Sequence, residues 1–135
     1  MKKEVSSQML INDIELSKSI KLARLVGPVL IIMTMSEMVN ANIWSTNTVV
    51  NIYENGFLLF TGGVAIAIYH NVWKFNWQVS LTIVGWCAML LGAVRMFFPL
   101  KQLTWAHQVE PIFFFALVTM VAGIYIMFRG YRTRL

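Results

Sequence analysis

Ionisable and amide side chains lie inside long apolar runs of this chain, where such groups can bind a ligand, an ion or a proton. Glu37 and Asn40 are three residues apart, and so are Asn51 and Glu54, so each pair shares one face of a helix. Arg95 follows in a third apolar run. Its planar guanidinium can bridge two carboxylates, and with two acids to one base, one carboxylate can hold a proton near neutral pH.

This polar cluster is predicted to lie at one depth in a membrane. Glu37 comes 13 residues after Arg24, which corresponds to about 20 Å along a helix. An ionised side chain at the centre of a span costs about 2.5–3.5 kcal/mol, and less when it faces the bundle and is paired. Two interpretations stay open. The cluster is either a clamp that holds three helices in register, or the lining of a water-filled outward cavity that binds a ligand, an ion or a proton.

The elements that position the cluster are predicted to be membrane-spanning helices. Of 135 residues, 58% are hydrophobic and 13% are charged, whereas soluble domains have roughly 25% charged residues. A spanning helix needs about 20 mainly apolar residues. Small residues in the second and third spans, Gly62, Gly63, Gly85 and Gly92, let neighbouring helices approach closely. The predicted spans run at 22–43, 49–69, 79–98 and 111–128.

Lysine and arginine residues give the predicted orientation, because the cytoplasmic ends of spans are rich in them. They gather in the N-terminal segment, in the link between the second and third spans and at the C-terminus. The sequence therefore predicts an all-α integral membrane protein, a four-transmembrane-helix bundle with both termini in the cytoplasm. Leu16 and Ile20 share one helix face, which favours a short N-terminal helix along the cytoplasmic interface. The predicted divisions are a polar segment at 1–21, a transmembrane domain at 22–128 and a basic tail at 129–135.

The remaining reactive side chains predict no cofactor, metal or catalytic centre. Cys87 is the single cysteine, so no internal disulfide and no multi-cysteine metal site is expected. His70 and His107 are predicted at opposite membrane faces, roughly 30 Å apart, which excludes a haem held by both. No fingerprint of a nucleophile elbow, a metalloprotease or a nucleotide-binding loop is found. His70, Asn71 and Trp73 are interpreted as interfacial residues at the inner end of the second span.

Four segments between Ala23 and Pro99 read ARLVGPVL, ENGFLLFTGG, IYHNVWKFNWQVSLTIVGW and VRMFFP. In these segments the chain resembles small bacterial four-span inner-membrane proteins. The resemblance implies a bacterial inner membrane and a four-helix fold, and it implies no activity. The small multidrug transporters also have four short spans and a glutamate in the first one. Because Glu37 lies later in its span and no other motif matches, their function is not transferred.

The sequence leaves several functions open. The first is a non-enzymatic inner-membrane protein, an accessory or scaffold component that the polar cluster holds together. The second is a small transporter or channel that uses Glu37, Glu54 and Arg95 in an outward-facing site. A membrane enzyme is the third. The lipid bilayer is the expected environment, and a homodimer or a larger membrane complex is compatible with four spans. Nucleic acid is not an expected partner, because lysine and arginine gather beside apolar runs.

Overall fold

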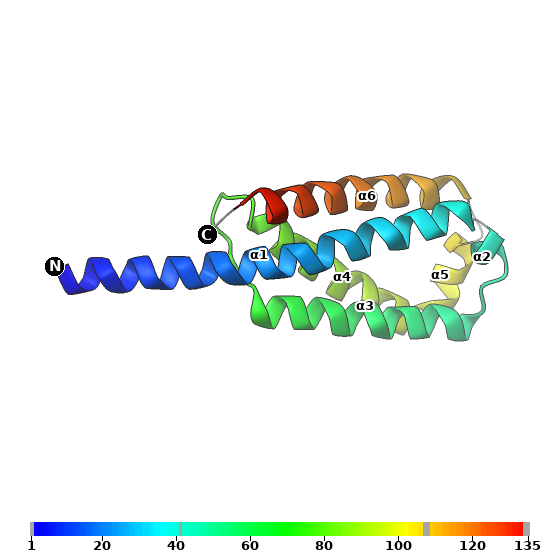
Figure 1. Cartoon of the computed structure of the whole chain (residues 1–135). Helices are drawn as coiled ribbons and strands as arrows, with labels where there is room; N and C mark the ends of the chain where they lie inside the picture. Colours follow the sequence, from blue (N-terminus) through cyan, green and yellow to red (C-terminus); the bar gives the residue numbers. More distant parts are fainter. Residues whose placement is uncertain (1, 41, 107–108, 134–135) are drawn as a thin grey trace.

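The computed structural model of this chain is all α-helical (Figure 1). It describes residues 2–40, 42–106 and 109–133, with side chains at 4–40, 42–105 and 113–133. His107 therefore lies outside the described residues. The helices are, in chain order, α1 (Lys2–Val39), α2 (Asn42–Ser45), α3 (Val49–Tyr69), α4 (Val79–Phe97), α5 (Pro99–Ala106) and α6 (Val109–Arg132).

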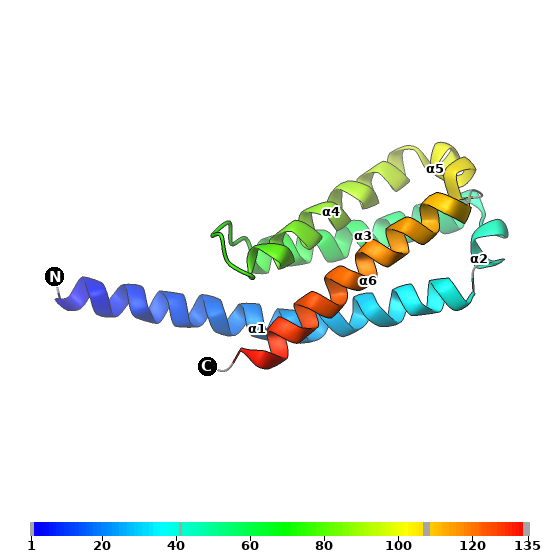
Figure 2. The same ribbon diagram turned by 90° about the horizontal axis from the view of Figure 1, so that it is seen from above.

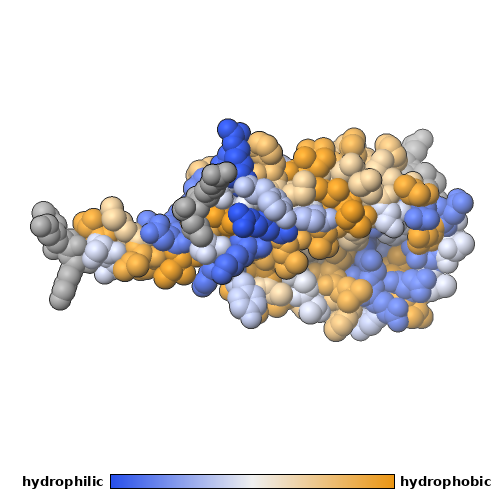
Figure 3. Space-filling model, in the orientation of Figure 1, coloured by the Kyte–Doolittle hydropathy of each residue, from blue (hydrophilic) through white to orange (hydrophobic). Residues whose placement is uncertain are grey.

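Four of the described helices are long and apolar enough to cross a membrane. Many of their large apolar side chains are exposed, including Leu58 at 69% and Phe115 at 66%. Figure 3 shows orange apolar side chains along the bundle, with blue hydrophilic side chains near its ends. A continuous apolar surface of this kind fits contact with a lipid bilayer. The candidate spans are Glu4–Val39, Val49–Tyr69, Val79–Phe97 and Phe113–Arg132, which confirms the four helical spans predicted from the sequence.

The long helices pack as two pairs, α1 with α6 and α3 with α4. Figure 1 shows α6 beside α1, and Figure 2 shows α4 beside α3. Close approach of α3 to α4 depends on glycine, because a Cβ atom at Gly63 would lie 2.4 Å from Met89 N. A Cβ atom at Gly92 would lie equally close to Phe60 N, at 2.4 Å. Gly62 has no other helix within 4 Å of such an atom, so its predicted part in a close contact is wrong.

A buried apolar core joins the two helix pairs at one end of the bundle. We call this the His70 end, since His70 directly follows α3 there, and we call the opposite end, where α2 and α5 lie, the α2 end (Figure 1). Contacts between the pairs elsewhere are few. The core consists of Ile20, Ala23, Trp77, Leu81 and Ile126.

Helix α1 differs from the prediction in its N-terminal part. The sequence predicts a short helix within 1–21 that lies along the interface and leads into the first span, whereas Lys2–Val39 forms one continuous helix. Both views show its N-terminal part projecting beyond the His70 end (Figures 1 and 2). The reason is local, because no glycine or proline interrupts the chain between Lys2 and Val26. The helix continues through Pro28.

The helix limits at the C-terminal side also differ from the prediction. The sequence leaves 99–110 as a link, but Pro99–Ala106 forms the short helix α5. Proline suits its first position, where the missing N–H has no helical partner to lose. Helix α6 extends past residue 128 and carries Arg129 and Arg132 in its last turn. Cations at a helix C-terminus are stabilised by the helix dipole.

Candidate functional site

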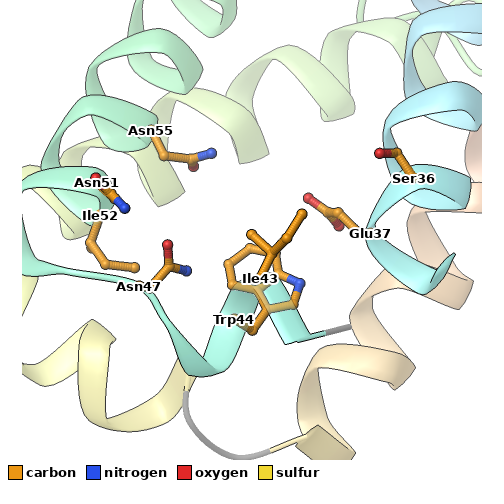
Figure 4. A pocket seen from close by; sticks show the side chains of 8 residues that line it. All are labelled: Ser36, Glu37, Ile43, Trp44, Asn47, Asn51, Ile52 and Asn55. Atoms are coloured by element: carbon orange, nitrogen blue, oxygen red, sulfur yellow. The ribbon is translucent and has the colours of Figure 1, made fainter. Parts of the chain in front are cut away.

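A cavity of about 230 Å³, lined by both polar and apolar side chains, opens at the α2 end between α1 and α3. Its floor is the segment after α1, which carries α2 and leads into α3. The side chain of Thr48 accepts a hydrogen bond from Asn51 N at 3.3 Å and so caps α3. The residues that line the cavity, drawn in Figure 4, are Ser36, Glu37, Ile43, Trp44, Asn47, Asn51, Ile52 and Asn55.

Two polar groups of the cavity have no partner among the described residues. The half-buried carboxylate of Glu37 forms no hydrogen bond or ion pair with any of them. Figure 4 shows it directed from α1 into the space beside Trp44. The indole Nε1 of Trp44 is buried and also lacks a hydrogen-bond acceptor in the described part of the chain. A buried donor without a partner costs about 1–3 kcal/mol, so water or a ligand is needed to satisfy it.

Arg95 of α4 is engaged within its own helix pair. Its Nη1 donates a hydrogen bond to Oδ1 of Asn55 on α3. The field of Arg95 reaches Glu37, but no ion pair within 4.0 Å joins their described side chains. The polar side chains described at this end therefore link α3 to α4 and do not bond α1 to either helix.

The structure brings part of the predicted polar cluster together. Glu37 and Asn51 both line the cavity, and Arg95 lies beside it through Asn55. Asn40 is exposed, and its Nδ2 donates to the Ser36 carbonyl at 2.9 Å within the same turn. Glu54 is exposed and does not line the cavity. Whether the cluster is a functional site stays a prediction.

Of the three amides on the α3 side of the cavity, sequence reasoning included Asn51 in the polar cluster and missed Asn47 and Asn55. Asn47, Asn51 and Asn55 recur every four residues, which is a helical spacing that the sequence does display. The prediction paired Asn51 with Glu54 instead, because a spacing of three also places residues on one helix face. Nothing local in the sequence around Trp44 indicates that its indole N–H is buried.

A second polar site lies at the His70 end, where it joins the two helix pairs. His70 is 3% exposed, and its Nε2 lies 2.9 Å from Ser19 Oγ of α1. Its Nδ1 lies 3.2 Å from Thr82 Oγ1 of α4. Gln78 Nε2 donates to Ser19 Oγ at 2.8 Å. Burial lowers the pKa of His70 below its usual range, while its own backbone and the carboxylate of Glu15 act in the opposite direction.

The other predicted interfacial residues surround this site at the surface. Asn71 is exposed and accepts a hydrogen bond at 2.7 Å from Nε1 of Trp73. Trp73 is 59% exposed, and its ring centroid lies 6.5 Å from that of Trp86. Lys74 Nζ lies 3.0 Å from Glu15 Oε2, which adds an exposed ion pair between α1 and the α3–α4 link.

The reactive side chains of the described residues include a buried serine beside a histidine and one exposed cysteine. Ser19 and His70 have the spacing of a nucleophile and its base, but Ser19 is 0% exposed, so no substrate reaches its hydroxyl. Among the described side chains, no group of three or more histidine, cysteine, aspartate or glutamate residues gathers to hold a metal ion. Cys87 is exposed and free.

Comparison of this chain with protein-family models, curated proteins and solved structures finds no match. The resemblance to small bacterial four-span proteins therefore stays a prediction, supported only by the four long apolar helices. A functional conclusion must come from the cavity and from the buried site at the His70 end.

Proposed function

We propose that this chain is a small non-enzymatic inner-membrane transport protein that binds a small, positively charged solute in the cavity at the α2 end. The observation that carries the proposal is the Glu37 carboxylate, which faces the cavity without a partner among the described residues. A carboxylate in this setting attracts a cation. The indole ring of Trp44 adds an aromatic face, which also favours cationic ligands.

The predicted orientation makes this cavity outward-facing. The His70 end carries Lys18, Lys21, Arg129 and Arg132, and positively charged ends of spans lie in the cytoplasm. The α2 end then faces the other side of the membrane, and the projecting N-terminal part of α1 lies in the cytoplasm. The bacterial inner membrane follows from the resemblance alone.

The helix pairing supports transport more than a rigid clamp. The pairs α1/α6 and α3/α4 share a buried core at the His70 end and have no direct polar bond around the cavity among the described residues. Many transporters alternate access by moving two helix bundles against each other around a binding site. In this protein, movement of α1/α6 against α3/α4 would open or close the cavity around a bound cation.

Binding and uptake of choline test the proposal, with its uncharged carbon isostere dimethylbutanol as the control ligand. Glu37→Gln keeps the shape of the side chain and removes its charge, while Glu54→Gln makes the same change at an exposed neighbour outside the cavity. Choline is expected to stabilise wild type and Glu54→Gln in detergent, by about 2.7 kcal/mol at 100 times its dissociation constant. Choline is not expected to stabilise Glu37→Gln to the same extent. Wild type and Glu54→Gln should likewise take up choline into proteoliposomes faster than Glu37→Gln does.

The result that would overturn the proposal is equal behaviour of the two variants. If choline, methylammonium and guanidinium neither stabilise wild type nor enter proteoliposomes, the cavity does not bind small cations. If Glu37→Gln binds choline as wild type does, the carboxylate has another role.

An accessory protein is the second candidate, and the projecting part of α1 favours it. Val5, Met9, Leu10 and Ile14 are each more than half exposed there, at 52%, 63%, 63% and 54%. Exposed apolar side chains on a helix beyond the bundle suit contact with another membrane component. Removal of residues 2–14 should then reduce a native complex to the isolated chain, whereas an unchanged complex size would exclude this use of the segment.

A further inference from the structure

The buried hydrogen bonds around His70 can be assigned by counting protons. Thr82 Oγ1 donates its one proton to the Val72 carbonyl at 3.0 Å and accepts the Val72 N–H at 3.0 Å. It can therefore only accept from His70 Nδ1, which lies 3.2 Å away. This arrangement places a proton on Nδ1.

Ser19 has one proton and two candidate acceptors. Its Oγ lies 2.7 Å from the Glu15 carbonyl and 2.9 Å from His70 Nε2, and it already accepts from Gln78 at 2.8 Å. When His70 is neutral with the proton on Nδ1, Ser19 must donate to Nε2, and its bond to Glu15 is lost. When Nε2 is protonated as well, it donates to Ser19, and Ser19 donates to Glu15.

The opposite neutral tautomer loses a more valuable bond. With the proton on Nε2 alone, Thr82 would have to donate to Nδ1 and give up the Val72 carbonyl. That carbonyl belongs to the non-helical link between α3 and α4, while the Glu15 carbonyl lies inside α1 and keeps its helical hydrogen bond. The neutral ring therefore carries its proton on Nδ1, and only the doubly protonated ring completes every bond.

We propose that His70, Ser19 and Thr82 form a proton-binding site between the two helix pairs, in which proton uptake at Nε2 turns the Ser19 hydroxyl from His70 to the Glu15 carbonyl. The proton comes from water at the His70 end, and the ring gains one positive charge while no covalent bond to carbon changes. Because Ser19 belongs to α1 and Thr82 to α4, the proton is held where the pairs meet. This inference does not depend on the proposed cation site.

The charged groups around the site differ in sign. Glu15 on α1 is the anion whose field favours the protonated ring, and it is partly neutralised by Lys74 of the α3–α4 link at 3.0 Å. Arg129 on α6 is a cation that lies over the Trp77 ring, 5.8 Å from its centroid. Burial disfavours the positive charge of the doubly protonated ring, so the pKa of His70 lies below the usual range of histidine. The hydrogen bonds nevertheless accommodate the second proton.

Nitrogen NMR of the full-length protein labelled at histidine tests the proposal directly. In a His107→Gln background His70 is the single histidine. At alkaline pH we expect Nδ1 to carry a proton and Nε2 to carry none. On acidification Nε2 should become protonated, with a midpoint below about 6.5 while the protein is still folded. The proposal is overturned if the neutral ring is protonated at Nε2, or if the ring keeps one protonation state at every pH that preserves the fold.

Two variants make opposite changes on the two sides of the ring. Thr82→Val removes the acceptor of the Nδ1 proton, so the neutral ring should switch to the tautomer protonated at Nε2, which can still donate to Ser19. Ser19→Ala should keep the proton on Nδ1. The same tautomer in both folded variants would show that Thr82 and Ser19 do not direct the ring.

Discussion

The contact between α3 and α4 is expected to tolerate no added methyl group at Gly63. A Cβ atom there would lie 2.4 Å from Met89 N and 2.6 Å from the Gly85 carbonyl oxygen, so backbone rather than a flexible side chain has to move. Overpacking of this kind costs about 1–3 kcal/mol. Alanine gains about 0.8–1.0 kcal/mol over glycine as a helix former, which offsets part of the cost. At Gly62 the same methyl group meets nothing within 4 Å, so only the gain remains.

Gly63→Ala should therefore be less stable than Gly62→Ala by about 1–3 kcal/mol, the overpacking cost alone. Reversible unfolding in mixed detergent micelles, followed by helical circular dichroism, measures this difference between neighbouring positions of one helix. Their lipid exposure differs, so each variant is compared with wild type as well. Equal stability of the two variants would refute the packing of α3 on α4 through this face.

Three further predictions concern the polar sites. Because burial lowers the pKa of His70 in the folded protein, the unfolded chain binds the proton more readily, so wild type should lose stability as the pH falls below about 6.5. His70→Gln should show a smaller decrease of the melting temperature as the pH falls. An equally steep decrease in this variant would contradict the prediction. Trp44→Phe removes an unpartnered N–H and should stabilise the free protein by about 1 kcal/mol in the same assay. The same variant should weaken choline binding. A destabilised variant would mean that the indole N–H has a hydrogen-bond partner. Asn55→Ala and Arg95→Met should show a coupling energy of about 0.6 kcal/mol or more in a double-mutant cycle, and strict additivity would exclude their hydrogen bond.

The four spans are predictable from sequence because length and hydropathy are local properties. Apolar runs of about 20 residues specify a spanning helix whatever its neighbours are. The ends of the helices are harder to predict where the flanking residues are also good helix formers. For this reason α1 begins at Lys2 and α6 ends at Arg132, beyond the predicted spans. The pairing of α1 with α6 is a long-range property, and no single span encodes it.

The rotation of each helix about its axis is what the sequence leaves undetermined at the cavity. Glu54 and Asn55 are neighbours and differ by about 100° around α3, so depth alone does not say which of them meets Arg95. Packing decides it, because a Cβ atom at Gly56 would lie 2.8 Å from Arg95 Cβ. That contact turns Asn55 toward α4 and leaves Glu54 exposed. The hydrogen bond between His70 and Ser19 joins residues 51 positions apart, so the sequence alone does not predict it either.

The polar groups around His70 are more completely hydrogen-bonded than those of the cavity at the α2 end. This difference fits a role in stability for the first site and the proposed binding role for the second. At the His70 end, the hydroxyl, amide and imidazole groups of Ser19, Thr82, Gln78 and His70 have partners across the helix pairs, while Nε of Arg129 is buried without one among the described residues. At the α2 end, Glu37 and the indole of Trp44 lack them within the described chain, which weakens the isolated fold. A structural clamp would gain from pairing Glu37 with Arg95, since a carboxylate and a guanidinium form strong hydrogen bonds. Arg95 instead binds an amide, which leaves the Glu37 carboxylate without a partner among the described residues, as the proposed cation site requires.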